Sequence, residues 1–372
     1  MRRFVAGLAA LAASTWVCAQ GVTDTEVVLG QSVPLSGPSE QLGKDMQQGA
    51  RLYFDQVNAR GGVNGRKITL KTLDDGYEPP RAADNTRKLI DQQKVFALFG
   101  YVGTPTSQAA LPIFTEAHVP FVGAFTGAEL LRQPFNRYVF NVRASYFDET
   151  EAIVQHLTAM SIDKIAVFYQ NDAYGQAGLA GVERALAKRK LQVAGKATVE
   201  RNSVDVKAAV ATMSKTPAQA IIMIGAYKSC AAFIKEMKKA GATPTFWNVS
   251  FVGSKALAKE LGPEGRGVQI SQVMPFPWDN TIPVVKEYRK AVDEAKGEPG
   301  WGTLEGYIAA KVTTEGLRRA GRNLTRDTFI KAMESMGDYD AGGFKVSFGP
   351  EDHNGSHFVD LTIVSRDQKF VR

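Results

Sequence analysis

The stretch PLSGPSEQLGKDMQQGARLYFDQVNARGGVNGRKITL, residues 34–70, sets the folding pattern of this 372-residue chain. An apolar run, residues 27–33, precedes it and predicts a strand. Apolar residues then recur at three- and four-residue spacing and predict a helix over 41–59. The Gly- and Asn-rich segment 58–65 is typical of a turn, and 68–73 predicts the next strand. This stretch therefore predicts a strand–helix–strand unit.

The same alternation continues to the end of the chain in two comparable stretches, and the second begins after about residue 141. Such alternation predicts an α/β fold with two doubly wound parallel-sheet lobes, in which ligands bind at the carboxyl ends of strands. The predicted strands are 27–33, 68–73, 95–99, 120–123, 138–141, 165–169, 192–199, 220–224, 245–249, 268–273, 344–348 and 357–365. The predicted helices are 41–59, 80–91, 105–118, 147–160, 174–190, 204–215, 227–240, 282–296, 304–320 and 325–336.

The N-terminus has the pattern of a secretory signal peptide. Arg2 and Arg3 precede an apolar run over residues 4–13, and Val17-Cys18-Ala19 offers a cleavage site after Ala19. Processing before a lipid-modified Cys18 is the alternative. Removal of the first 19 of 372 residues leaves 353, enough for about two domains. The sequence therefore predicts a periplasmic location.

Composition argues against several partners. The formal charge of +7 falls to +5 without Arg2 and Arg3, and no basic block is interleaved with aromatic residues, so no nucleic acid is expected. After cleavage only Cys230 remains, so no intramolecular disulfide can form. We expect a monomer with a small buried thiol at Cys230.

Motifs for catalysis and cofactors are missing from the sequence. The first strand–helix turn, GQSVPLSGPSEQLG, lacks the G-x-G-x-x-G spacing of a dinucleotide site, and residues 37–44 miss the P-loop pattern by one residue. No G-x-S-x-G elbow occurs. His353 and His357 lie in a turn-like DHNGSH segment rather than on a helix face. We therefore expect a protein that is not an enzyme, with no cofactor and no metal.

Two loops that follow neighbouring strands are the best candidates for ligand contact. In the first loop Gly103 removes a side chain where a ligand would approach, and Thr104 is predicted to cap a helix that opens at Pro105. The second loop carries Ala124, Phe125 and Thr126. Such strand ends meet at one sheet edge, where a helix N-terminus attracts a carboxylate. The alternative is that Thr104 only caps its helix.

The second half offers aromatic residues at equivalent strand ends. Tyr174 and Tyr227 follow the strands that end near residues 169 and 224, and Phe251 follows the strand that ends near 249. Each of them could equally be part of the hydrophobic core.

The chain resembles the leucine/isoleucine/valine-binding family of type I periplasmic binding proteins, which are the solute receptors of ABC transporters. The matching segments occur in the family's order and span nearly all of the mature chain. They are residues 34–70, DDGYEP (74–79), GYVGTPTSQAALPIF (100–114), DAYGQAGLAGV (172–182) and GAYKSCAAFIKEMKKAGA (225–242).

The resemblance implies two lobes joined by three crossover strands, which we place near Arg143, Met274 and Phe348. It also implies an ABC transporter permease as partner. By this likeness Thr104, Ala124 and Thr126 would hold the carboxylate of the ligand, and Tyr174 and Tyr227 would close over it. The implied domains are the signal peptide 1–19, lobe 1 from 20–143 plus 275–347, and lobe 2 from 144–274 plus 348–372.

The sequence departs from the family at three points, one of which is Leu42, where the family often has an aromatic residue in the first loop. Amino-acid receptors of the family place a carboxylate against the ligand's ammonium just after the strand that ends near Val249, and here that residue is Ser250. The family also often has a disulfide between the positions of Tyr77 and Gly103, which this chain lacks. An ammonium buried without a counter-charge costs several kcal/mol. Either another acid serves, or the ligand has no ammonium.

The expected function is therefore that of an extracytoplasmic solute receptor of an ABC importer. Its two lobes would close on a small carboxylate-bearing solute, either an amino acid or an ammonium-free aromatic or keto acid. The alternative is a ligand-sensing module for a membrane signalling protein.

Overall fold

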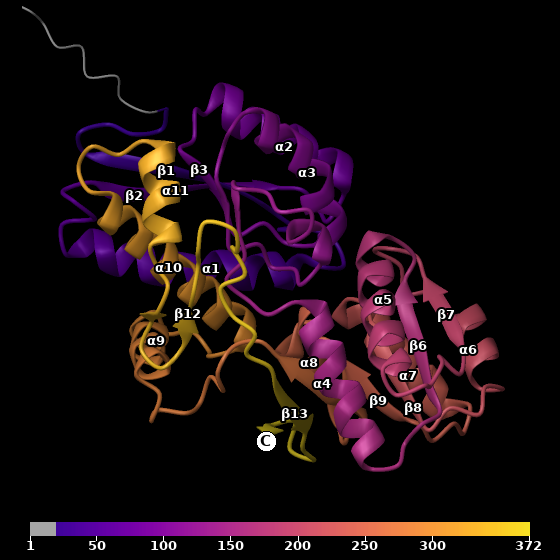
Figure 1. The fold of residues 1–372 in the computed structure, drawn as a ribbon. Coiled ribbons are helices and arrows are strands. Elements are labelled where there is room, and N and C mark those ends of the chain that lie inside the picture. The colour runs from indigo at the N-terminus through magenta and orange to yellow at the C-terminus, as the bar shows by residue number, and fades with distance from the viewer. Residues whose placement is uncertain (1–19) are drawn as a thin grey trace, which may run out of the picture.

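The computed structural model describes residues 20–372, so the predicted signal peptide lies outside the described residues. Two α/β lobes lie side by side (Figure 1). Among residues 20–372, no helix has both the length and the apolar character required to cross a bilayer. The chain passes between the lobes three times, and these connecting segments contain Arg143, Met274 and Phe348.

The first lobe contains a five-stranded sheet of order β2-β1-β3-β4-β5, in which every pairing is parallel. Its strands are β1 (Glu26–Val33), β2 (Lys67–Asp74), β3 (Ala97–Phe99), β4 (Phe121–Val122) and β5 (Val139–Phe140). Its helices are α1 (Glu40–Ala59), α2 (Pro79–Arg87), which continues as a π-helical turn (Lys88–Gln92), α3 (Thr104–Glu116), α9 (Pro283–Glu294), α10 (Trp301–Ala320) and α11 (Arg326–Glu334).

The second lobe contains a seven-stranded sheet of order β14-β13-β10-β9-β8-β6-β7. Its strands are β6 (Ile165–Gln170), β7 (Lys196–Val199), β8 (Ala220–Ile224), β9 (Thr245–Asn248), β10 (Gln269–Gln272), β13 (Asp360–Val364) and β14 (Phe370–Val371). Its helices are α4 (Tyr146–Ala159), α5 (Ala173–Ala187), α6 (Lys207–Met213), α7 (Tyr227–Lys239) and α8 (Ser254–Leu261). A two-stranded sheet pairs β11 (Tyr339–Asp340) with β12 (Lys345–Val346).

The predicted α/β fold with two parallel-sheet lobes is confirmed, with one addition at an edge. β13 pairs antiparallel with β10, and β14 pairs antiparallel with β13. The antiparallel edge arises because the chain returns to lobe 2 only after α9–α11, so no crossover helix precedes β13. All five residues of β8 are buried and apolar, as expected for a central strand covered on both faces.

Glycines allow α1 and α10 to approach closely in lobe 1. A Cβ on Gly49 would lie 1.9 Å from the carbonyl oxygen of Thr303, and one on Gly306 would lie 2.4 Å from the carbonyl oxygen of Met46. These two helices cover one face of the five-stranded sheet, and α2 and α3 cover the other (Figure 1). This packing fixes the start of α10, which faces the second lobe.

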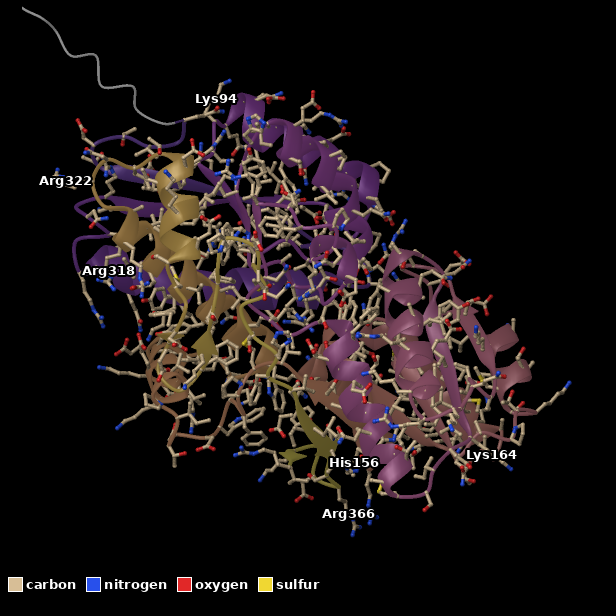
Figure 2. All side chains as sticks on the ribbon, in the orientation of Figure 1. Lys94, His156, Lys164, Arg318, Arg322 and Arg366 are labelled. Atoms are coloured by element: carbon tan, nitrogen blue, oxygen red, sulfur yellow. The ribbon has the colours of Figure 1, made fainter. Side chains whose placement is uncertain are left out.

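Side chains fill the space between the ribbons in both lobes (Figure 2). Figure 2 shows Lys94, Arg318 and Arg322 at the periphery of lobe 1. Lys164 and Arg366 lie at the far end of lobe 2.

Candidate functional site between the lobes

The two loops singled out in the sequence lie side by side where β3 and β4 end. Val102 pairs with Phe125 in a parallel bridge, and the N–H of Gly103 donates to the carbonyl of Phe125 over 3.2 Å. The hydroxyls of Thr104 and Thr126 are 2.6 Å apart and fully buried. The expected juxtaposition of these loops is therefore present.

The predicted helix cap at Thr104 is wrong. α3 begins at Thr104 itself, and Gly103 is the capping residue with φ of 102°. A residue with a Cβ is strained at this φ, and its Cβ would lie 2.2 Å from Cε2 of Tyr77. Gly103 thus lets Thr104 enter the first helical turn, which leaves its hydroxyl free to bond Thr126. Where the family often has a disulfide, this chain packs a tyrosine ring on a glycine.

Ala124 occupies a different environment from its neighbours. Its methyl group packs with Tyr101 and Phe121 in the core of lobe 1, whereas Phe125 belongs to the main core that extends to the second lobe. Its carbonyl accepts a hydrogen bond of 2.9 Å from the N–H of Thr126. Any contact of Ala124 with a ligand would therefore come from its backbone.

Five rings from both lobes form a buried aromatic cluster, defined here as Tyr77, Phe125, Tyr146, Tyr174 and Phe251. Phe251 is central, with ring centroids 4.5 Å from Tyr174, 5.5 Å from Phe125 and 5.9 Å from Tyr77. Tyr146 lies 5.4 Å from Tyr174. These contacts cross the interface between the lobes, so the structure describes a closed arrangement.

Tyr174 carries a polar atom without a partner. Its hydroxyl is buried and makes no hydrogen bond. Burial raises the pKa of Tyr174 well above its ordinary value, so the hydroxyl keeps its proton as a donor. Thr126, whose Oγ1 is 3.3 Å from the hydroxyl of Tyr146, connects this part of the cluster to the two loops. A buried hydroxyl without a partner is costly and indicates a position for a ligand or water.

Tyr227 is not part of the aromatic cluster. It lies at the start of α7 and lines an outer groove of about 440 Å³ between the lobes. Gln41 and Asp45 of α1 contribute the opposite wall, together with Thr303 of α10. Of the two tyrosines expected to close over a ligand, Tyr174 therefore lies inside the interface and Tyr227 at its rim.

Ser250 lies in a buried ion cluster, defined here as Arg143, Glu149, Ser250 and Glu305, that sequence reasoning missed. Arg143 Nη2 donates to Oε1 of Glu149 over 2.7 Å and also to the hydroxyl of Ser250. Glu149 accepts three further bonds, from the N–H and hydroxyl of Ser250 and from the hydroxyl of Ser271, at 2.7, 3.0 and 2.6 Å. Ser250 stands where amino-acid receptors of the family place the carboxylate that contacts the ligand's ammonium. Here its hydroxyl and N–H are already hydrogen-bonded within the ion cluster.

Arg143 also contacts lobe 1. Its guanidinium lies 5.4 Å from the ring centroid of Phe125, and its Nη1 is 3.4 Å from Oε1 of Glu305. Burial would lower the pKa of Arg143, but the carboxylates of Glu305 and Glu149 raise it above its ordinary value. Glu149 lies in the first turn of α4, where the helix dipole alone would account for an acid. No sequence spacing links Arg143 to Glu305, which lies 162 residues away.

A second set of contacts holds the closed lobes together at the surface. We call Glu78, Arg201 and Asn202 the interlobe clasp. Arg201 Nη2 donates to Glu78 over 3.1 Å, and Asn202 Nδ2 donates to Glu78 over 2.8 Å and to the carbonyl of Gly76 over 3.1 Å. Arg201 and Asn202 come from lobe 2, whereas Gly76 and Glu78 come from lobe 1. The clasp bridges the two lobes, so we expect opening of the lobes to break it.

We expect the double variant Arg201→Ala with Asn202→Ala to favour the open form. Each lost contact is worth about 0.5–1.5 kcal/mol, so ligand affinity should fall about tenfold because fewer molecules are closed. Small-angle scattering without ligand should give a larger radius of gyration. Lys196→Ala, which removes an exposed ion pair with Glu183 inside lobe 2, is the matched control. An unchanged radius together with unchanged affinity would contradict this role of the clasp.

Within residues 20–372, no three His, Cys, Asp or Glu side chains are grouped so that they could hold a metal ion. Cys230 is buried as expected, and burial raises the pKa of its thiol. The fold and the interface together define a class, that of two-lobed α/β proteins with a groove between the lobes.

Comparison with known proteins identifies the family. The model of the periplasmic binding protein family matches residues 26–369, so the chain belongs to that family, and its type is that of the leucine/isoleucine/valine-binding proteins. Its members are solute-binding proteins rather than enzymes, which confirms the expectation from sequence.

Individual relatives agree with this assignment. The amino acid binding protein of Pseudomonas aeruginosa is 27% identical over 330 residues, which cover 86% of each chain. The Leu/Ile/Val-binding protein homolog 7 of Brucella suis is 25% identical, over 92% of this chain and 89% of its own. The crystal structure of a possible leucine/isoleucine/valine-binding protein from Rhodopirellula baltica superposes with a TM-score of 0.90 at 34% identity, covering 94% of this chain and 97% of the other.

Proposed function

We propose that this protein is the extracytoplasmic solute receptor of an ABC importer and that its lobes close on a small carboxylate-bearing solute. The solute is an amino acid or an ammonium-free aromatic or keto acid. The name of the Pseudomonas aeruginosa relative, amino acid binding protein, supports the first of these. The partners are this solute and a membrane permease, which the closed receptor would meet in the periplasm.

The observation that carries the proposal is the buried Tyr174 hydroxyl without a partner, in an aromatic cluster to which both lobes contribute. On the lobe 1 side the Thr104–Thr126 hydroxyl pair lies at the start of α3. Hydroxyl and backbone N–H groups at a helix start suit a carboxylate. We assign carboxylate binding to Gly103, Thr104, the backbone of Ala124, and Thr126, with Tyr174 as the donor from lobe 2.

The remaining candidates have supporting roles in this proposal. Phe125 and Phe251 enclose the apolar part of the solute, and Tyr227 closes the outer groove. Ser250 holds the ion cluster in place. Lobe 1 then comprises residues 20–143 and 275–347, and lobe 2 residues 144–274 and 348–372, with hinges near Arg143, Met274 and Phe348.

The binding free energy expected from these contacts is consistent with this assignment. Micromolar affinity needs about 8 kcal/mol. Hydrogen bonds to a charged group contribute about 1.5–3 kcal/mol each. Three such bonds together with burial of an apolar side group against the aromatic cluster reach that value.

A thermal-shift screen of carboxylic acids tests the function directly. A cognate acid at 100 times its Kd should add about 2.7 kcal/mol to the free energy of unfolding. With that acid, the double variant Thr104→Val with Thr126→Val is expected to bind at least 100-fold more weakly, because valine keeps the shape of threonine but removes both hydroxyls. The double serine variant, which keeps the hydroxyls, should retain affinity. Unchanged affinity of the valine variant would refute the site.

A further inference from the structure

Glu305 at the second turn of α10 is a buried carboxylate with spare hydrogen-bonding capacity. Its side chain is 5% exposed. Its one hydrogen bond among residues 20–372 is the 3.4 Å contact from Arg143 Nη1 to Oε1, and Oε2 receives none. A buried carboxylate usually accepts several bonds, so Glu305 lacks donors that a bound molecule could supply.

The carboxylate lines a small cavity on the hinge side of the aromatic cluster. The cavity has a volume of about 10 Å³ and is also lined by Phe125, Ser250, Gln272 and Trp301. That volume holds one small polar group and no more. Phe125, which lies between Ala124 and Thr126 in the sequence, is the lining residue that this cavity shares with the two site loops.

The charges of the buried ion cluster do not balance. Arg143 is the cation paired with both Glu149 and Glu305. Glu149 accepts four hydrogen bonds from Arg143, Ser250 and Ser271, so it is satisfied as an anion. When both acids are ionised, the cluster therefore carries one negative charge in excess, and the acid with fewer hydrogen bonds is Glu305. Burial raises the pKa of Glu305 to about 7, because an ionised carboxylate there lacks a full counter-charge.

The neighbouring charged groups do not supply the missing cation. Arg132, which is buried behind Arg143, donates to the carbonyls of Ala128 and Arg143 at 2.9 and 3.1 Å and interacts with Glu129. Lys255 pairs with Glu298 at the outer groove. Neither contacts Glu305, so among residues 20–372 no cation other than Arg143 pairs with this carboxylate.

We propose that Glu305 is the specificity-determining residue for a protonated amine on the solute, so that the solute carries an ammonium together with its carboxylate. This rests on the proposed function, in which the carboxylate lies at Thr104 and Thr126. Glu305, on a helix of lobe 1, takes the role that Ser250 cannot perform on lobe 2. The acidic partner for the amine would thus lie on α10, and not after β9, where the amino-acid receptors of the family have it.

The test compares each of the 20 common L-amino acids with its deaminated analogue, for example L-leucine with 4-methylpentanoate, on the wild type and on Glu305→Gln. We expect at least one amino acid to bind the wild type more than tenfold more tightly than its analogue. Glu305→Gln should lower the affinity for that amino acid about 100-fold, because the ammonium loses its buried counter-charge, and should leave the analogue unaffected. Glu305→Asp should restore part of the affinity.

Glu315→Gln is the matched control, because Glu315 is a buried acid on the same helix that pairs with Arg318 and Arg319 away from the cleft. It should bind like the wild type. Equal or tighter binding of the deaminated acids, or unchanged amino-acid affinity in Glu305→Gln, would overturn the inference and leave the carboxylate receptor standing. Failure of both series to bind the wild type would refute the proposed ligand class as well.

The pH dependence of the melting temperature, measured without ligand, tests for the excess negative charge at Glu305. Since the folded-state pKa of Glu305 lies above the unfolded value, the stability that this group contributes is lost as pH rises from about 4.5 to about 7. The melting temperature of Glu305→Gln relative to wild type should therefore increase from pH 5 to pH 8. A Glu305 that only anchors Arg143 would instead give a difference in melting temperature between Glu305→Gln and the wild type that stays constant or falls from pH 5 to pH 8, which would contradict the inference.

Discussion

Replacing Arg143 with methionine is expected to lower the free energy of unfolding by about 3–5 kcal/mol, although methionine fills a similar volume. The change removes the cation that pairs with Glu149 at 2.7 Å and with Glu305 at 3.4 Å, and it leaves both carboxylates buried. Urea denaturation at pH 8, where both acids are ionised once exposed, should show the loss as a lower midpoint.

Arg137→Met is the matched control, because Arg137 is half exposed and pairs only with exposed Asp327 over 3.4 Å. Exposed pairs contribute about 0–1 kcal/mol, so this variant should resemble the wild type. Adding Glu149→Gln and Glu305→Gln to Arg143→Met should recover part of the stability, since the buried charges are then removed together. A loss below about 1 kcal/mol in Arg143→Met would show that the buried ion cluster does not depend on its cation.

Replacing Gly103 with alanine is expected to abolish ligand binding and to destabilise lobe 1 by about 2–4 kcal/mol. The new Cβ would lie 2.2 Å from the ring of Tyr77, and the residue has φ of 102°. Tyr77 cannot yield easily, because its ring is buried against Phe251 and its hydroxyl accepts a 3.3 Å hydrogen bond from Gln170 of lobe 2. Displacement of Tyr77 would also move Thr104, the next residue after Gly103.

Gly61→Ala separates the strain of a positive φ from the steric clash with Tyr77, the two causes of the expected destabilisation in Gly103→Ala. Gly61 has a similar φ of 96°, but a Cβ there would meet nothing within 4 Å. It should show only the backbone penalty of about 1–2 kcal/mol, with ligand binding retained. Thermal unfolding and ligand titration measure both quantities. If Gly103→Ala and Gly61→Ala lose the same stability and both bind ligand, then the contact between Tyr77 and Gly103 is not required for closure.

Local sequence was sufficient to predict the neighbouring loops of the site. Because β3 and β4 are short parallel neighbours, the residues that follow them meet at one sheet edge, and Thr104 and Thr126 are indeed in contact. The helix cap was wrong because a threonine before a proline fits the capping pattern as well as it fits a first helical turn. The φ of 102° at Gly103 decided between them.

The ion cluster could not have been found by pattern. Glu149 follows Ser145, which caps α4 with Asp148, and an acid in that turn is explained by the helix dipole alone. Its true partners, Arg143, Ser250 and Ser271, come from a connecting segment and from the ends of two other elements of lobe 2. Long-range polar partners have no periodicity, because a side chain needs only one partner within reach in space.

By itself the sequence determined the succession of strands and helices and the two-lobed α/β class, and it predicted which strand ends lie side by side. These follow from periodicity and from the geometry of parallel sheets, which act locally along the chain. Only the tertiary structure decided which of the two buried acids, Glu149 or Glu305, keeps an oxygen that accepts no hydrogen bond from the described residues. It brings Glu305 of α10 to Arg143 across 162 residues, while Ser250, the expected position, is already hydrogen-bonded to Glu149. The difference in hydrogen bonding between the two acids matters because both are buried. An unbalanced charge costs little free energy in water but much more between closed lobes.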